Sequence, residues 1–223
     1  MTTTTYRIPV ADYREAVKAS LNTSAAYWSY HMYKNAAGDA PTVHYCTKLD
    51  QAERVLQQHF LGQPVLGFDI EWEQRARKES AAKQNVSLIQ IACEDRICLI
   101  HVATFAGTNI EHLVPGTLRE ILESNQIVKA GVNIGGDARR MREYLGVNMR
   151  AQFELCPLFK LVTFARKDVN WTMKGAGLAA QVQAVLLLPM LKGDVRTSSW
   201  PRKLSKEQAD CKYQARSWVW RLA

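Results

Sequence analysis

Apolar and polar residues alternate in five short runs through the first two thirds of the chain. The runs are VHYC (43–46), VLGFDIEWE (65–73), VSLIQIAC (86–93), RICLIHVATF (96–105) and IVKAGVNI (127–134). Such alternation is typical of β-strands, because successive side chains of a strand point to opposite faces. The third and fourth runs are joined by a very short connection at residues 93–96, which predicts an antiparallel hairpin. We therefore expect five strands.

Helical spacing of apolar residues dominates most of the remaining sequence. It predicts helices at residues 11–21, 49–60, 118–125, 138–146, 156–166, 177–188 and 205–222. Strands come first along the chain, then strand and helix alternate, and helices come last. This order predicts an α/β protein with a mixed central sheet flanked by helices.

The chain is long enough, at 223 residues, to form one substantial core. We expect a single domain at residues 42–223, preceded by an N-terminal extension at residues 1–41, because the turn-rich segment NAAGDAP ends at Pro41. The aromatic run YWSYHMY (27–33) could form an edge strand. Packing is a commoner role for such a run than stacking on nucleic-acid bases.

Composition predicts an intracellular protein, either nuclear or cytoplasmic. No apolar run reaches the roughly 18 residues of a membrane span, and the longest candidate is broken by Pro189, so no membrane partner is expected. The first residues lack the apolar core of a secretory signal. The five cysteines are odd in number, scattered and without a CxxC pair, which indicates reduced thiols.

Positive charge is concentrated at the C-terminal end of the chain. The formal net charge is +8, and Lys192–Ala223 holds eight basic residues against three acidic ones. A basic segment of this kind suits a polyanionic partner such as nucleic acid. It is equally compatible with a solvated helix face.

The most unusual strand is VLGFDIEWE, because it carries two acids on one face. Asp69 and Glu71 are two residues apart, so their Cα atoms would lie about 6.6 Å apart on the same side. Two carboxylates at that spacing can reach one hard divalent cation such as Mg²⁺. The alternative is a half-exposed strand with a hydrated acidic face.

A third acid follows the last predicted strand. In GVNIGGDARRM a double glycine turns the chain and Asp137 opens an arginine-rich helix. An aspartate at a helix start commonly caps the helix. Asp137 also follows a probable central strand, where carboxylates from different elements can converge.

In combination, FDIEWE, VSLIQIA, GVNIGGDARRM, GLA and SSWPRKLSKEQ resemble the motifs of DEDD-type 3'-5' exonucleases over roughly residues 43–210. The likeness is to the exonuclease domain of Werner-syndrome helicase and, more distantly, to ribonuclease D. It implies a ribonuclease-H-like mixed five-stranded sheet, and single-stranded or 3'-ended DNA or RNA as partner. It also implies two Mg²⁺ or Mn²⁺ ions about 4 Å apart that hydrolyse the terminal phosphodiester. Asp69 would bridge both ions, Glu71 would ligate one, and Asp137 would support the pair. Gln90 is expected to be structural.

The resemblance breaks at the final Tyr-x-x-x-Asp motif. Counting from Gln208 places Cys211 and Ala215 at the tyrosine and aspartate positions, and the shifted register uses Tyr213 and Ser217. Neither register supplies a carboxylate, and Asp210 would lie some 140° around the helix from Ala215. A naturally impaired exonuclease, a divergent chain end and an engineered change would all produce this pattern.

Three hypotheses follow for function. The first is a 3'-5' exonuclease domain, either active or impaired by the missing fourth acid. The second is a catalytically inactive module that binds nucleic acid or a protein partner through the same groove. The third is an unrelated α/β protein whose acids coincide.

Overall fold

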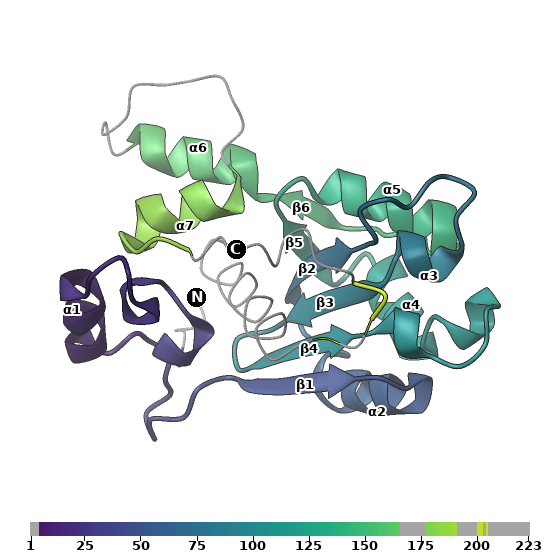
Figure 1. Cartoon of the computed structure of the whole chain (residues 1–223), viewed down its shortest axis with the longest axis horizontal. Coiled ribbons are helices and arrows are strands. Elements are labelled where there is room, and N and C mark those ends of the chain that lie inside the picture. The colour runs from purple at the N-terminus through teal and green to yellow at the C-terminus, as the bar shows by residue number, and fades with distance from the viewer. Residues whose placement is uncertain (1–4, 166–176, 191–199, 203, 205–223) are drawn as a thin grey trace.

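The described residues form a six-stranded mixed sheet with helices on both sides (Figure 1). The structure is a computed structural model that describes residues 5–165, 177–190, 200–202 and 204. The strand order is β1-β4-β3-β2-β5-β6. The pairs β1–β4, β2–β5 and β5–β6 are parallel, whereas β2–β3 and β3–β4 are antiparallel.

The strands are β1 (Thr42–Cys46), β2 (Val65–Glu71), β3 (Leu88–Ala92), β4 (Arg96–Ile100), β5 (Val128–Gly131) and β6 (Gln152–Glu154). The helices are α1 (Val10–Lys18), α2 (Leu49–His59), α3 (Ala82–Asn85), α4 (Gly116–Glu123), α5 (Ile134–Leu145), α6 (Leu155–Ala165) and α7 (Leu178–Leu186). Short 3-10 turns lie at Ser24–Ala26, Tyr30–Met32, Val102–Thr104 and Ile110–His112. The predicted α/β class and the β3–β4 hairpin are confirmed.

Alternation within the central strands divides their side chains between two cores. One face of the sheet packs against α2, α4 and α5 through a fully apolar layer that includes Leu66, Phe68, Ile70, Ile89, Ile91, Cys98 and Ile100. The opposite face carries a second cluster that contains Leu88, Ala92, Ile97, Leu99, Tyr30 and Trp200. The parity of β2 therefore places Asp69 and Glu71 on this second face.

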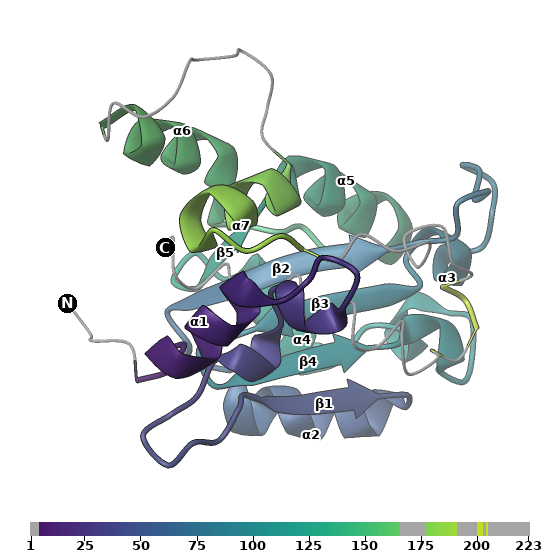
Figure 2. The same cartoon turned by 60° about the vertical axis from the view of Figure 1, so that its left-hand side comes forward.

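The N-terminal extension packs against α7. Buried Trp28, Tyr33 and Ala16 form a cluster with Val182 and Leu186, and Figure 2 shows α1 and α7 on the same side of the sheet. The backbone N–H of Trp28 donates to the carbonyl of Pro189 at 2.9 Å. The aromatic run is thus packed in the interior.

Three local expectations were wrong. The sheet has a sixth strand, β6, which is only three residues long and mostly exposed, so it leaves little alternation to detect. The aromatic run forms a 3-10 turn at Tyr30–Met32, and within it only Trp28 makes a β-bridge. Helix α5 begins at Ile134, four residues before its predicted start.

No helix in the described ranges combines the length and the apolar character needed to cross a membrane. The predicted helix at residues 205–222 and most of the basic C-terminal segment lie outside the described residues.

Candidate active site

Strand β2 carries two of the predicted acids near its carboxyl end. In its register with β3, Asp69 pairs with Gln90 and Glu71 pairs with Leu88. Both acidic side chains are half-buried, whereas Ile70 between them is buried in the opposite core. The strand thus presents both carboxylates on the sheet face opposite α2 and α4.

Gln90 lies beside Asp69 on the same sheet face. Its side chain is fully buried, and its Nε2 donates a hydrogen bond to Asp69 Oδ2 at 3.3 Å. Its Oε1 is buried with no hydrogen-bond donor in the described part of the chain. Gln90 therefore adds a buried, unsatisfied acceptor next to an acid, an arrangement that a cation or its bound water would relieve.

The β5–α5 connection brings the third predicted acid, Asp137, towards the carboxyl end of β2. Because β2 and β5 run parallel, β5 ends at Gly131 close to the end of β2. A Cβ on Gly131 would lie 2.9 Å from the carbonyl oxygen of Phe68, so only glycine permits this approach. The chain then turns through Asn133, whose φ of 59° and ψ of 35° are left-handed, and enters α5. Asp137 is the fourth residue of α5, and only 8% of it is exposed.

The electrostatics of Asp137 show which acids lie around it. Burial, followed by the charges of Glu71 and Glu154, raises the pKa of Asp137 to about 7, and Arg140 opposes this shift. Among the described residues, no ion pair within 4 Å neutralises Asp137. The structure therefore brings Glu71 and Asp137 into electrostatic contact, although 66 positions separate them in the chain.

These side chains do not form a closed ligand cage. In the portion of the chain that the structure describes, no group of three His, Cys, Asp or Glu side chains has the arrangement of a metal site. Asp69 and Glu71 thus lie at the carboxyl end of β2 and Asp137 lies in the first turn of α5, and the three side chains do not converge on a single point.

Sequence analysis missed Glu154, an acid that belongs to the same region. It is the last residue of β6, and its carboxylate accepts the backbone N–H groups of Asn133, Ile134 and Cys156 at 3.0, 3.1 and 3.2 Å. Asp137 does not cap α5, since no side-chain cap is present at the helix start. The three-residue strand QFE was too short to draw attention to Glu154.

Arg140 fixes the segment that connects β2 to β3. Its Nε and Nη2 each donate at 2.7 Å, to the carbonyl and to Oδ1 of Asn85, which is fully buried. Its guanidinium lies 4.3 Å from the ring centroid of Trp72, next to Glu71 in the chain. Arg140 of the arginine-rich helix α5 therefore holds the β2–β3 connection beside the site, and its charge is not simply exposed to solvent.

Trp200 and Leu204 pack on the sheet face that carries the acids. His101 is fully buried, with Nε2 at 2.9 Å from the Trp200 carbonyl and Nδ1 at 2.6 Å from the Tyr45 hydroxyl. The backbone N–H of Leu204 donates to that same hydroxyl at 3.3 Å. A single neutral tautomer satisfies all of these bonds, with Nε2 as donor and Nδ1 as acceptor. The positions of the degraded motif, Cys211 to Ser217, lie outside the described residues.

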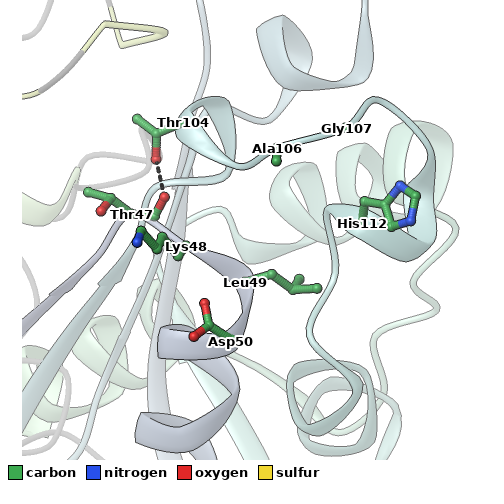
Figure 3. A pocket seen from close by; sticks show the side chains of 8 residues that line it. All are labelled: Thr47, Lys48, Leu49, Asp50, Thr104, Ala106, Gly107 and His112. Carbon is green, nitrogen blue, oxygen red and sulfur yellow. Dashed lines mark hydrogen bonds between the residues drawn. The ribbon is translucent and has the colours of Figure 1, made fainter.

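A pocket in the described structure lies away from the acids. It has a volume of about 800 Å³ and lies between the start of α2 and the segment at residues 104–112 (Figure 3). The Thr104 hydroxyl, which donates to the Thr47 carbonyl at 2.9 Å, closes one side of it. None of the predicted site residues lines this pocket. We therefore place the candidate site at the acids, because their carboxylates can bind a divalent cation.

Comparison with known proteins places the chain in a family. A family model described as 3'-5' exonuclease matches residues 43–215. The human exonuclease 3'-5' domain-containing protein 2 is 28% identical over 158 residues, which cover 68% of this chain and 23% of that protein. A 3'-5' exonuclease of Arabidopsis thaliana is 26% identical over 149 residues, which cover 66% of this chain and 47% of that protein. The chain thus spans less than half the length of these relatives.

Solved structures share the fold. The Nibbler EXO domain of Aedes aegypti superposes with a TM-score of 0.66 at 19% identity, covering 81% of this chain and 84% of that one. NrnC of Brucella melitensis, solved bound to pGG, gives 0.59 at 15% identity and covers 82% and 78%. With the family model matching most of the sequence, the predicted resemblance is confirmed: the chain belongs to the 3'-5' exonuclease family.

Proposed function

We propose that residues 42–223 form a metal-dependent nuclease unit that removes nucleotides from the 3' end of single-stranded or 3'-ended DNA or RNA, with residues 1–41 as an extension. Asp69, Glu71 and Asp137 are the proposed ligands of Mg²⁺ or Mn²⁺. The observation that carries the proposal is the position of Asp137, a buried acid beside Glu71 that lacks an ion-pair partner in the described structure. A protein of this family, with free cysteines, would act inside the cell, in the nucleus or the cytoplasm.

The donor set fits a hard divalent cation. Carboxylate oxygens are the ligands that Mg²⁺ and Mn²⁺ prefer, and the unsatisfied Oε1 of Gln90 adds an acceptor close to Asp69. Two such ions supply an activated water and neutralise charge at the scissile phosphate. The protein's own contribution is to hold the acids: Gln90 orients Asp69, and the start of α5 holds Asp137 against Glu71.

Cleavage of a 5'-labelled oligonucleotide tests the proposal. Wild-type protein with Mn²⁺ or Mg²⁺ should shorten single-stranded DNA or RNA stepwise, and Asp69→Asn and Asp137→Asn should each lower the rate at least about 100-fold. Glu143→Gln, an exposed acid on α5, is the matched control and should cleave normally. Equal cleavage by Asp69→Asn and the wild type would refute the assignment.

The degraded final motif favours a second candidate function. The sequence offers no carboxylate in either register of the last helix, so the domain would bind nucleic acid or a protein partner without cleaving. This alternative predicts salt-sensitive binding of single strands with no turnover in Mg²⁺ or Mn²⁺. Metal-dependent turnover would eliminate it.

A further inference from the structure

Glu154 replaces the missing N-terminal cap of α5. The first N–H groups of a helix have no partner within the helix and are commonly satisfied by the side chain of the N-cap residue. Here the N-cap is Asn133, which is left-handed and whose side chain makes no cap hydrogen bond. The carboxylate of Glu154, on a different element, accepts the N–H groups of Asn133 and Ile134 instead.

The orientation of Glu154 is fixed from two sides. In the β5–β6 register it pairs with Gly131, the last residue before the turn into α5. Its Oε1 also accepts the N–H of Cys156 at 3.2 Å, at the start of α6. Three N–H groups therefore hold one carboxylate, which faces the positive end of the α5 dipole.

The capped turn is the one that carries Asp137. Residues 134–137 form the first turn of α5, so the position of the Asp137 carboxylate depends on how this turn is held. Glu154 is also near enough to Asp137 to act on its charge, as Glu71 does. A second carboxylate beside a buried acid would be unfavourable for folding alone, which argues for a role in the site.

We infer that Glu154 is a positioning residue that holds the first turn of α5 and thereby sets where Asp137 meets Glu71. This inference rests on the proposed function, since the value of that position lies in divalent metal binding. Glu154 would act through Asp137, because the N–H groups of α5 and α6 orient its own carboxylate.

The chain contains a matched control for this role. Helix α4 starts after Pro115, which cannot cap with its side chain, and Glu53 from α2 takes over. The Glu53 carboxylate accepts the Thr117 N–H at 3.1 and 3.2 Å and the Thr117 hydroxyl at 2.6 Å. Glu53→Gln therefore weakens a cap of the same kind, because it leaves one acceptor oxygen in place of two, on a helix that carries none of the proposed ligands.

Two measurements on the full chain test the inference. Amide exchange followed by NMR should show that Glu154→Ala lowers the protection of the Ile134 N–H by about fivefold, the effect of losing one cap. Calorimetric titration with MnCl₂ should show Mn²⁺ affinity reduced about threefold or more in Glu154→Gln, unchanged in Glu53→Gln, and largely recovered in Glu154→Asp.

Each outcome decides a separate point. Unchanged protection of Ile134 in Glu154→Ala would overturn the capping role. Equal Mn²⁺ affinities in Glu154→Gln and Glu53→Gln would reduce Glu154 to an ordinary stability cap and overturn the positioning role. If wild-type protein binds no Mn²⁺, the proposed metal function fails and the positioning role fails with it, whereas the exchange data still report whether the cap exists.

Discussion

Replacing Asp137 with asparagine should stabilise the metal-free protein, by an amount that grows with pH. The pKa of Asp137 is raised from its ordinary value of 3.8 to about 7, first by burial and then by Glu71 and Glu154. The folded state therefore holds this proton more tightly than the unfolded state does. The resulting penalty is absent near pH 4, grows between pH 4 and 7, and is complete above pH 7.

The structure sets the size of this effect. A carboxyl group with a pKa of about 7 in place of 3.8 costs on the order of 4 kcal/mol of folding free energy at neutral pH. Local relaxation and water will reduce this, so we expect Asp137→Asn to gain about 2–4 kcal/mol at pH 8 and about zero at pH 4.

Urea unfolding at pH 4, 5.5, 7 and 8 with EDTA measures the gain, with Glu143→Gln as the control for removing an exposed charge from the same helix. Mn²⁺ should reverse the ranking, because it stabilises the wild type and binds the variant more weakly. A gain that is equal at all four pH values, or a loss at pH 8, would refute the electrostatic account of the site.

Three further substitutions test how the site is held. Gly131→Ala should lower the free energy of unfolding by about 1–3 kcal/mol in urea, because the new Cβ would lie 2.9 Å from a carbonyl oxygen of β2. Arg140→Lys should speed amide exchange in the β2–β3 connection about tenfold, since lysine cannot replace the paired hydrogen bonds to Asn85. Tyr45→Phe should cost about 1–3 kcal/mol of unfolding free energy, because it leaves Nδ1 of buried His101 without its donor.

Each of these three predictions has a result that would contradict it. A wild-type urea midpoint for Gly131→Ala would mean that β5 and β2 are farther apart than described. Unchanged exchange in Arg140→Lys would mean that other contacts hold the connection. If Tyr45→Phe is neutral, the packing of Trp200 and Leu204 does not depend on the buried histidine.

Local pattern was sufficient for the elements that bury one clean face. Strand β2 alternates over its whole length, so both its position and the shared face of Asp69 and Glu71 were predictable. The β3–β4 hairpin was equally readable from its short connection. Gln90 was expected only to be structural, and its hydrogen bond to Asp69 was not predicted.

The start of α5 could not be predicted because its cap comes from a distant residue. The segment NIGG contains two glycines, and the side chain of its N-cap residue, Asn133, makes no cap hydrogen bond. Local rules therefore assign this segment to a loop. The helix begins there because Glu154, 20 residues farther along the chain, satisfies its first N–H groups. The same holds for α4, which starts at Gly116 under the carboxylate of Glu53. Sequence spacing cannot report a cap that only the tertiary fold supplies.

The missing fourth acid should affect turnover more than metal attraction. Burial first, and then the charges of Glu71 and Glu154, raises the pKa of Asp137 to about 7, so its ionisation is opposed near neutral pH. A divalent cation is therefore favoured by residues that the structure describes, whatever stands at position 215. The resemblance implies that the lost aspartate would be a fourth acidic ligand and that the lost tyrosine would orient the attacking water, so their absence weakens one metal position and slows the reaction. Because Asp69, Glu71 and Asp137 remain, we expect Mn²⁺ binding with slow cleavage, and restoring both residues as Cys211→Tyr with Ala215→Asp should raise the rate at least about tenfold with a smaller gain in Mn²⁺ affinity. A gain in affinity without any gain in rate would refute this expectation.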